Sequence, residues 1–169
     1  MNSPKPIDIF LMPGDFFVGD ERYRVRTLLG SCVSITLWHP RFRIGAMSHF
    51  LLPGYSRKSN AGKSGIYGID AMNLLLAGLA SRGVPLNQCQ GKIFGGGAMF
   101  PRSDKVKDIG RQNGDCAHDL MQQHGINVVS ESLFGEGHRQ LIFNIRTGEV
   151  LSRQVPPELK PASRTRENA

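Results

Sequence analysis

The sequence has few cysteines, and their spacing excludes two kinds of small-protein scaffold. The three cysteines are widely separated, at Cys32, Cys89 and Cys116. Such an odd, dispersed set forms neither a zinc ribbon nor a disulfide framework, and it is typical of a reducing compartment. We therefore predict free thiols and no metal site built on paired cysteines.

Long apolar runs are also missing. No stretch approaches the roughly 20 residues that a membrane-spanning helix needs. Residues 1–6 lack the apolar core of a secretory signal peptide. We therefore predict a cytoplasmic protein without membrane insertion.

Positive charge is in excess, but it is not gathered into a binding motif. Lysine and arginine number 21 against 14 acidic residues, which gives a formal net charge of +7. The basic residues are scattered and no aromatic-rich motif accompanies them, which disfavours nucleic-acid binding. Several lie near the end of the chain, so we predict a flexible basic tail over residues 156–169.

The strongest local pattern is a pair of alternating segments that predicts a β-hairpin. Val33, Ile35 and Leu37 alternate with other side chains, and the alternation resumes beyond Pro40-Arg41. We predict a two-residue turn at Pro40-Arg41.

This turn sets which residues face each other. It pairs His39 with Phe42 and, counted outward, Cys32 with His49. Opposed Cβ atoms of an antiparallel pair lie about 4.5–5.5 Å apart, close enough for a thiol to meet an imidazole.

A cysteine facing a histidine suggests a nucleophile and its base. Gly30 and Ser31, which precede Cys32, would let a substrate approach the backbone and would aim amide N–H groups at an oxyanion. Spacing alone leaves open that both residues are ordinary core side chains. A metal site using Cys32, His39 and His49 is disfavoured, because His39 has the opposite parity to Cys32.

Three separate motifs resemble the CheD family of chemoreceptor glutamine deamidases. They are residues 27–33 (TLLGSCV) with His49 in GAMSHFLLP, residues 92–100 (KIFGGGAMF) and residues 108–113 (DIGRQN). The resemblance runs from about Asp15 to about Val155. It implies a Cys-His-Thr site that hydrolyses side-chain amides of receptor glutamines.

The resemblance also assigns a third site residue and the partners. Family members carry a threonine five or six positions before the cysteine; here Thr27 is the fifth and Arg26 the sixth. Thr27 is therefore the candidate that orients His49. The implied partners are methyl-accepting chemoreceptors, as substrate, and a CheC-type phosphatase. The alternative from another functional class is a non-catalytic docking module.

The glycines Gly95, Gly96 and Gly97 predict a tight turn at the floor of a site, where a substrate or anion could approach the backbone. They do not form a dinucleotide fingerprint. The sequence Gly62-Lys63-Ser64 is not a P-loop either, because Arg57 stands where the first glycine belongs. We predict no cofactor.

The remaining patterns predict one α+β domain with mixed, mostly antiparallel, sandwich-like sheets flanked by about two helices. We expect a loose lead over residues 1–14, a CheD-like domain over 15–155, and a polar loop over 53–68 beside the site. Helices are predicted at 69–82 and 108–124, the second with an apolar stripe that includes His124. About eight strands are predicted, at 15–18, 23–29, 33–39, 42–49, 91–94, 126–130, 139–146 and 149–155.

Overall fold

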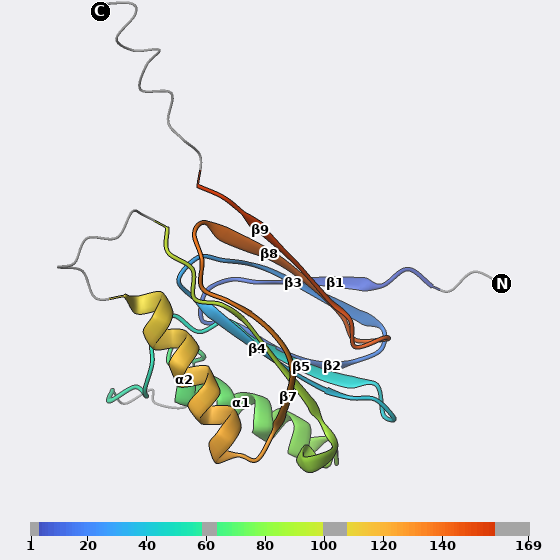
Figure 1. Ribbon diagram of the computed structural model, residues 1–169. Helices are drawn as coiled ribbons and strands as arrows, with labels where there is room; N and C mark the ends of the chain where they lie inside the picture. Colours follow the sequence, from blue (N-terminus) through green and yellow to red (C-terminus); the bar gives the residue numbers. More distant parts are fainter. Residues whose placement is uncertain (1–3, 59–63, 100–107, 158–169) are drawn as a thin grey trace, which may run out of the picture.

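Two β-sheets and two helices build the fold in three layers (Figure 1). The computed structural model describes residues 4–58, 64–99 and 108–157. In this part of the chain the elements are β1 (Ile7–Leu11), β2 (Phe16–Asp20), β3 (Tyr23–Leu29), β4 (Val33–His39), β5 (Ile44–Ser48), α1 (Gly68–Ser81), the 3-10 turn η1 (Leu86–Gln88), β6 (Gln90–Gly95), α2 (Ile109–Gln123), β7 (Asn127–Leu133), β8 (His138–Asn144) and β9 (Val150–Val155).

The first sheet has the strand order β1-β3-β8-β9, and the second has the order β2-β5-β4-β6-β7. Five of the strand pairs are antiparallel, and β1–β3 and β6–β7 are parallel. The predicted α+β class with mixed, mostly antiparallel sheets is confirmed. Neither described helix is long and apolar enough to cross a bilayer.

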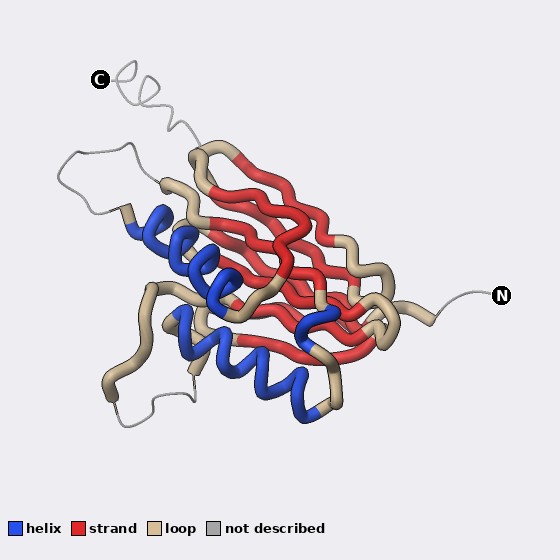
Figure 2. Tube along the Cα trace, turned by 60° about the horizontal axis from the view of Figure 1, so that its bottom comes forward, coloured by secondary structure: helices blue, strands red, loops and turns tan. Residues whose placement is uncertain are grey.

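The helices cover only one face of the second sheet, and the first sheet packs on its other face (Figures 1 and 2). One apolar cluster, which includes Ile35, Leu75 and Leu120, lies between the second sheet and the helices. A second cluster, which includes Val25, Met47 and Phe143, lies between the two sheets. The second sheet is therefore covered on both sides.

The central strand β4 shows the effect of this layering. Six of its seven residues are buried, and only Trp38 is partly exposed. By contrast β3, whose outer face is open, alternates buried Val25, Thr27 and Leu29 with exposed Arg26 and Leu28. The alternation predicted for β4 therefore separates two buried faces. It does not separate a buried face from a solvent-exposed face.

The hairpin turn differs from the predicted one. His39 pairs with Ile44, so residues 40–43 form a four-residue loop instead of a two-residue turn. Two-residue hairpin turns require a positive φ at their first central residue, which the ring of Pro40 forbids. The positive φ, +51°, falls instead on Arg43 at the end of the loop.

The change of register moves the partner of Cys32 by two residues. Val33 bridges Phe50, so the predicted direct opposition of Cys32 and His49 is wrong. A shift of two residues leaves every side chain on its original face, whereas a shift of one would reverse it. Cys32 and His49 therefore still share the face of the second sheet that is turned toward the first sheet.

The structure also differs from prediction at residues 7–11 and at His124. Residues 7–11, expected in a loose lead, form β1, which pairs in parallel with β3. Residues 158–169 of the tail predicted over 156–169 lie outside the described residues, as do residues 59–63 of the 53–68 loop. His124 is exposed just beyond the end of α2, so its place in the apolar stripe was wrong.

Candidate active site

The three predicted catalytic residues come from three segments that meet between the sheets. Thr27 lies on the inward face of β3, in the first sheet. Cys32 precedes β4 and packs against the apolar cluster between the sheets. His49 follows β5 and is 2% exposed. The site is therefore assembled from both sheets and not from one hairpin.

Thr27 fixes the orientation of the His49 ring. Its Oγ1 lies 2.7 Å from Nδ1 of His49 and 2.7 Å from the carbonyl oxygen of Leu11. A carbonyl only accepts, so the single hydroxyl proton of Thr27 is donated to Leu11. Nδ1 of His49 must then carry a proton and donate it to Thr27. In the neutral ring the basic lone pair is therefore on Nε2.

The backbone of His49 is fixed as well. Its N–H donates to the carbonyl of Asp15 at 3.2 Å, and its carbonyl accepts from Gly14 N–H at 2.8 Å. These bonds continue the pairing of β2 with β5 by one residue pair. Both the main chain and the ring of His49 are thus held in place.

Burial favours the neutral forms of both reacting groups. It lowers the pKa of His49 to about 4, although the carboxylate of Asp15 acts in the opposite direction. It also raises the pKa of the Cys32 thiol, while the backbone N–H of Cys32 itself lowers it. At rest Cys32 is therefore a thiol and His49 a neutral imidazole, rather than a preformed ion pair.

The glycine-rich segment holds the loop that carries Cys32. The N–H of Gly96 donates to the carbonyl of Cys32, and the N–H of Gly97 donates to the carbonyl of Gly30, both at 2.9 Å. These two amides are engaged by protein carbonyls and do not face a substrate.

Glycine is required at Gly95 for two reasons. Its φ is +115°, a conformation that other residues rarely adopt. A Cβ on Gly95 would lie 2.2 Å from the carbonyl oxygen of Cys32, and a Cβ on Gly30 would press on the side chain of Met99 at 3.0 Å. Gly95 thus allows close packing of its backbone on that of Cys32, and Gly30 allows close approach of the Met99 side chain.

Two polar residues that the sequence analysis missed support this loop. Asn113 of α2 is fully buried, and its Nδ2 donates to the carbonyls of Ser31 and Leu51. Arg139 of β8 is 2% exposed, and its guanidinium donates to the carbonyls of Gly95 and Phe134. A periodicity signal existed for Asn113, since it precedes Ala117 by four residues and Leu120 by seven on the buried face of α2. For Arg139 the signal is the period-2 alternation of β8, which puts it on the same buried face as Leu141 and Phe143.

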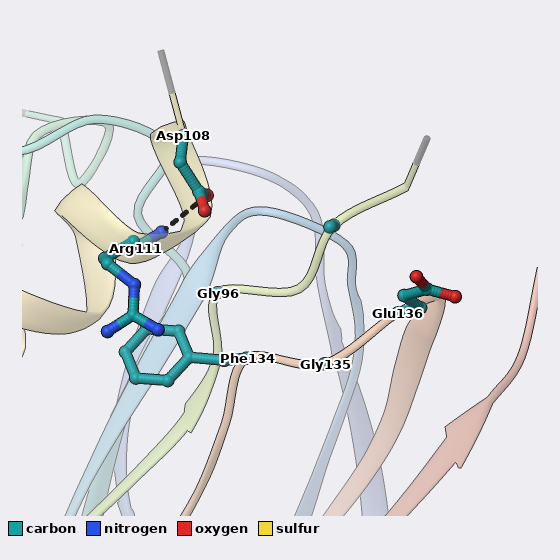
Figure 3. Close-up of a pocket in the computed structure, with 7 residues that line it drawn as sticks. Gly96, Asp108, Arg111, Phe134, Gly135 and Glu136 are labelled. Carbon is teal, nitrogen blue, oxygen red and sulfur yellow. Dashed lines mark hydrogen bonds between the residues drawn. The ribbon is translucent and has the colours of Figure 1, made fainter. Parts of the chain in front are cut away.

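A cavity of about 320 Å³ opens beside the glycine segment (Figure 3). Its lining includes Gly96, Arg111, Phe134 and Glu136, but neither Cys32 nor His49. The guanidinium of Arg111 lies over the ring of Phe134, 4.3 Å from its centroid. The cavity therefore neighbours the Cys32 loop without containing the three catalytic candidates.

His39 does not join Cys32 and His49. It lies at the far end of β4, where Nδ1 accepts the Phe42 N–H at 3.0 Å and Nε2 lies 2.8 Å from Oε1 of Gln88. Both ring nitrogens are thus engaged in protein hydrogen bonds. Within the described residues, no group of three or more His, Cys, Asp or Glu side chains is arranged to hold a metal ion.

Comparison with known proteins gives consistent similarities. Residues 51–154 match the family described as CheD chemotactic sensory transduction. The chain is 55% identical over 159 residues to the probable chemoreceptor glutamine deamidase CheD 2 of Albidiferax ferrireducens, with 90% of each chain covered. It is 41% identical over 144 residues to the corresponding CheD 3 of Dechloromonas aromatica, with 85% of each covered.

A protein of Chromobacterium violaceum, named probable chemoreceptor glutamine deamidase CheD 1, is 39% identical over 163 residues, which cover 94% of this chain and 84% of the relative. These alignments span most of the chain. The family match itself covers more than half of the residues. On this evidence the chain is a member of the CheD family.

Proposed function

We propose that this protein is a chemoreceptor glutamine deamidase in which Cys32 is the nucleophile, His49 the general base and Thr27 the residue that orients His49. One observation carries the assignment of roles. The bonds from His49 to Thr27 and from Thr27 to Leu11 place the only basic lone pair of the ring on Nε2. The names of the relatives supply the substrate, a glutamine side chain of a chemoreceptor.

The first half of the reaction forms a thioester. His49 Nε2 takes the proton of the Cys32 thiol as the sulfur attacks the carboxamide carbon of the glutamine. The carbonyl becomes a tetrahedral oxyanion. His49 then gives the proton to the nitrogen, the C–N bond breaks, and ammonia leaves.

The second half restores the enzyme. His49 Nε2 takes a proton from water, whose oxygen attacks the thioester carbon. The C–S bond breaks and the proton returns to the sulfur of Cys32. The product is a glutamate side chain, so each turnover adds one negative charge to the target at neutral pH.

The oxyanion is stabilised by a backbone donor at the nucleophile. The Cys32 N–H belongs to the same residue as the attacking sulfur, so it is a backbone donor close to the carbon that the sulfur attacks. The Gly96 and Gly97 amides support this donor indirectly, because they hold the carbonyls of Cys32 and Gly30.

A protein substrate suits the surroundings of the site. Cys32 is only partly buried. Several exposed apolar side chains lie on segments next to Cys32, Thr27 or His49, namely Met12, Leu52, Ile66 and Met99. Exposed apolar side chains near a site favour a protein partner. We also propose that the protein is located in the cytoplasm and that its second partner is a CheC-type phosphatase.

Mass spectrometry of a chemoreceptor cytoplasmic fragment tests the proposal. The fragment is incubated with the wild type, with Cys32→Ala and with a matched control, Cys116→Ala, which removes another partly buried thiol. We expect the small mass gain of carboxamide becoming carboxylate, mapped to individual glutamines, with the wild type and the control only.

Other results would change the assignment. A mass gain with Cys32→Ala would exclude this thiol as the nucleophile. Binding of the fragment without a mass gain, even with the wild type, would favour the non-catalytic docking module.

A further inference from the structure

The buried amide of Asn113 links the two segments that carry Cys32 and His49. Its Nδ2 donates to the carbonyl of Ser31, directly before Cys32, at 2.9 Å, and to the carbonyl of Leu51, two residues after His49, at 2.8 Å. Both contacts span a long sequence distance, from α2 to the N-terminal third of the chain. One side chain therefore ties the nucleophile loop to the segment that bears the base.

The orientation of this amide is fixed by its partners. Both partners are carbonyl oxygens, which only accept, so both N–H bonds of Nδ2 are used. A flipped amide would place Oδ1 against two carbonyls. In the described part of the chain Oδ1 has no hydrogen-bond partner, although the side chain is fully buried. A buried acceptor without a partner destabilises the folded protein by about 1–3 kcal/mol. The two hydrogen bonds that Nδ2 donates are therefore accompanied by the cost of the unsatisfied Oδ1.

The backbone of α2 approaches closely enough for this contact because of a glycine. A Cβ on Gly110 would lie 2.4 Å from the carbonyl oxygen of Gly96. Gly110 precedes Asn113 by three residues and is buried on the same helix face. The first turn of α2 thus packs against the glycine segment, and Asn113 reaches past it to Ser31.

The bond to Ser31 has an electronic consequence at the nucleophile. The Ser31 carbonyl and the Cys32 N–H belong to one peptide group. A hydrogen bond to the carbonyl polarises that group and strengthens its N–H as a donor. This N–H belongs to the same residue as the sulfur of the proposed nucleophile.

We propose that Asn113 is a positioning residue for the deamidation reaction, which joins the Cys32 loop to the His49 segment and strengthens the Cys32 N–H toward the oxyanion. The proposal depends on the proposed function for its kinetic part. Its geometric part concerns the reactivity of Cys32 and can be measured without a receptor.

Two variants of Asn113 test the role. Asn113→Asp keeps the size of the side chain but replaces both donors by an acceptor that faces two carbonyls. Asn113→Ala removes both donors without adding charge, and it serves if the first variant does not fold. The control is Leu120→Ala, which opens a cavity on the same face of α2 away from the two carbonyls. All proteins are compared at temperatures where each is fully folded by circular dichroism.

Two readouts are measured. The first is kcat and KM for deamidation of a receptor fragment. We expect kcat to fall by about tenfold or more in the Asn113 variants, since small displacements of reacting groups have effects of this size, while KM stays within about twofold. The second is the rate of Cys32 alkylation by iodoacetamide against pH. We expect the alkylation profile to move to higher pH in these variants but not in Leu120→Ala.

The outcomes separate the two proposals. An unchanged kcat and an unchanged alkylation profile in the folded Asn113 variants would overturn the positioning role. Equal losses in Leu120→Ala would also overturn it, because the effect would then follow stability alone. A shifted alkylation profile in a protein whose wild type deamidates no receptor would support the link to Cys32 and would reject the proposed function.

Discussion

Two buried histidines at opposite ends of one hairpin have different environments. His39 and His49 are each 2% exposed. Both nitrogens of His39 are engaged, one by the Phe42 N–H and the other by Gln88. Nδ1 of His49 is hydrogen-bonded to Thr27, whereas no hydrogen bond to Nε2 is found in the described residues. A buried histidine is thus suited to act as a base when one ring nitrogen is fixed and the other is left open.

The largest expected effect is a difference in deamidation rate between variants of the two histidines. His49→Gln removes the base, and we expect the deamidation rate to fall by about 10²–10⁴-fold. His39→Gln lies outside the site, and its folded protein should keep the wild-type rate. Initial rates on a receptor fragment measure both. Equal losses in the two variants would contradict the distinction.

The second prediction concerns the residue that leaves Nε2 open. Thr27→Val has nearly the same shape but cannot accept the Nδ1 proton of His49, so the ring can adopt either tautomer. We expect kcat to fall by about 10–100-fold, an amount in line with a loss of orientation. Thr27→Ser, which keeps the hydroxyl, should restore most of the rate. If Thr27→Ser were as slow as Thr27→Val, the packing of the Thr27 methyl group would matter rather than its hydroxyl group.

The third prediction uses pH. Burial lowers the pKa of His49 to about 4 in the folded protein, from 6.5 in the unfolded chain. The unfolded chain therefore binds the proton first as pH falls. The stability contributed by neutral His49 is present above pH 6.5 and is lost progressively toward pH 4.

Between pH 7 and pH 5 this loss amounts to about 2 kcal/mol in the free energy of unfolding. Urea denaturation of the wild type and of His49→Gln measures it. The variant should lose less stability over the same interval. Parallel curves for the two proteins would show that His49 is not the group that titrates.

The smallest expected effect is at the other end of the hairpin. Gln88→Ala removes the partner of His39 Nε2, and we expect a loss of about 1 kcal/mol in the free energy of unfolding. The rate of deamidation should not change, because η1 is remote from Cys32. Thermal unfolding and initial rates test the two halves of this statement. A lower deamidation rate with unchanged stability would mean that a change at the His39 end of the hairpin alters the geometry of the candidate site.

The elements of the fold were largely predictable because their patterns are local. The alternation of Tyr23 to Leu29 and the helical spacing of Met72, Leu75 and Leu79 are set by which face is buried. Strand β1 was missed because it is a short edge strand. Its position depends on the parallel partner β3 rather than on a turn in its own sequence.

The candidate site residues could be named from the sequence, but the way in which they assemble could not be predicted. Cys32 and His49 were placed on the correct face, since a two-residue shift preserves parity. Their exact opposition failed because the prediction ignored the fixed φ of Pro40. The contact of Thr27 with His49 crosses between sheets, and the contacts of Asn113 depend on the docking of α2. Such non-local contacts leave no local pattern.

The division of the site between two sheets also governs when the enzyme becomes active. The imidazole is oriented only after β3 of one sheet closes on the end of β5 in the other. A half-folded chain therefore lacks the orientation of His49 on which the proposed mechanism depends. The Thr27–His49 contact thus couples the orientation of the imidazole to completion of the fold.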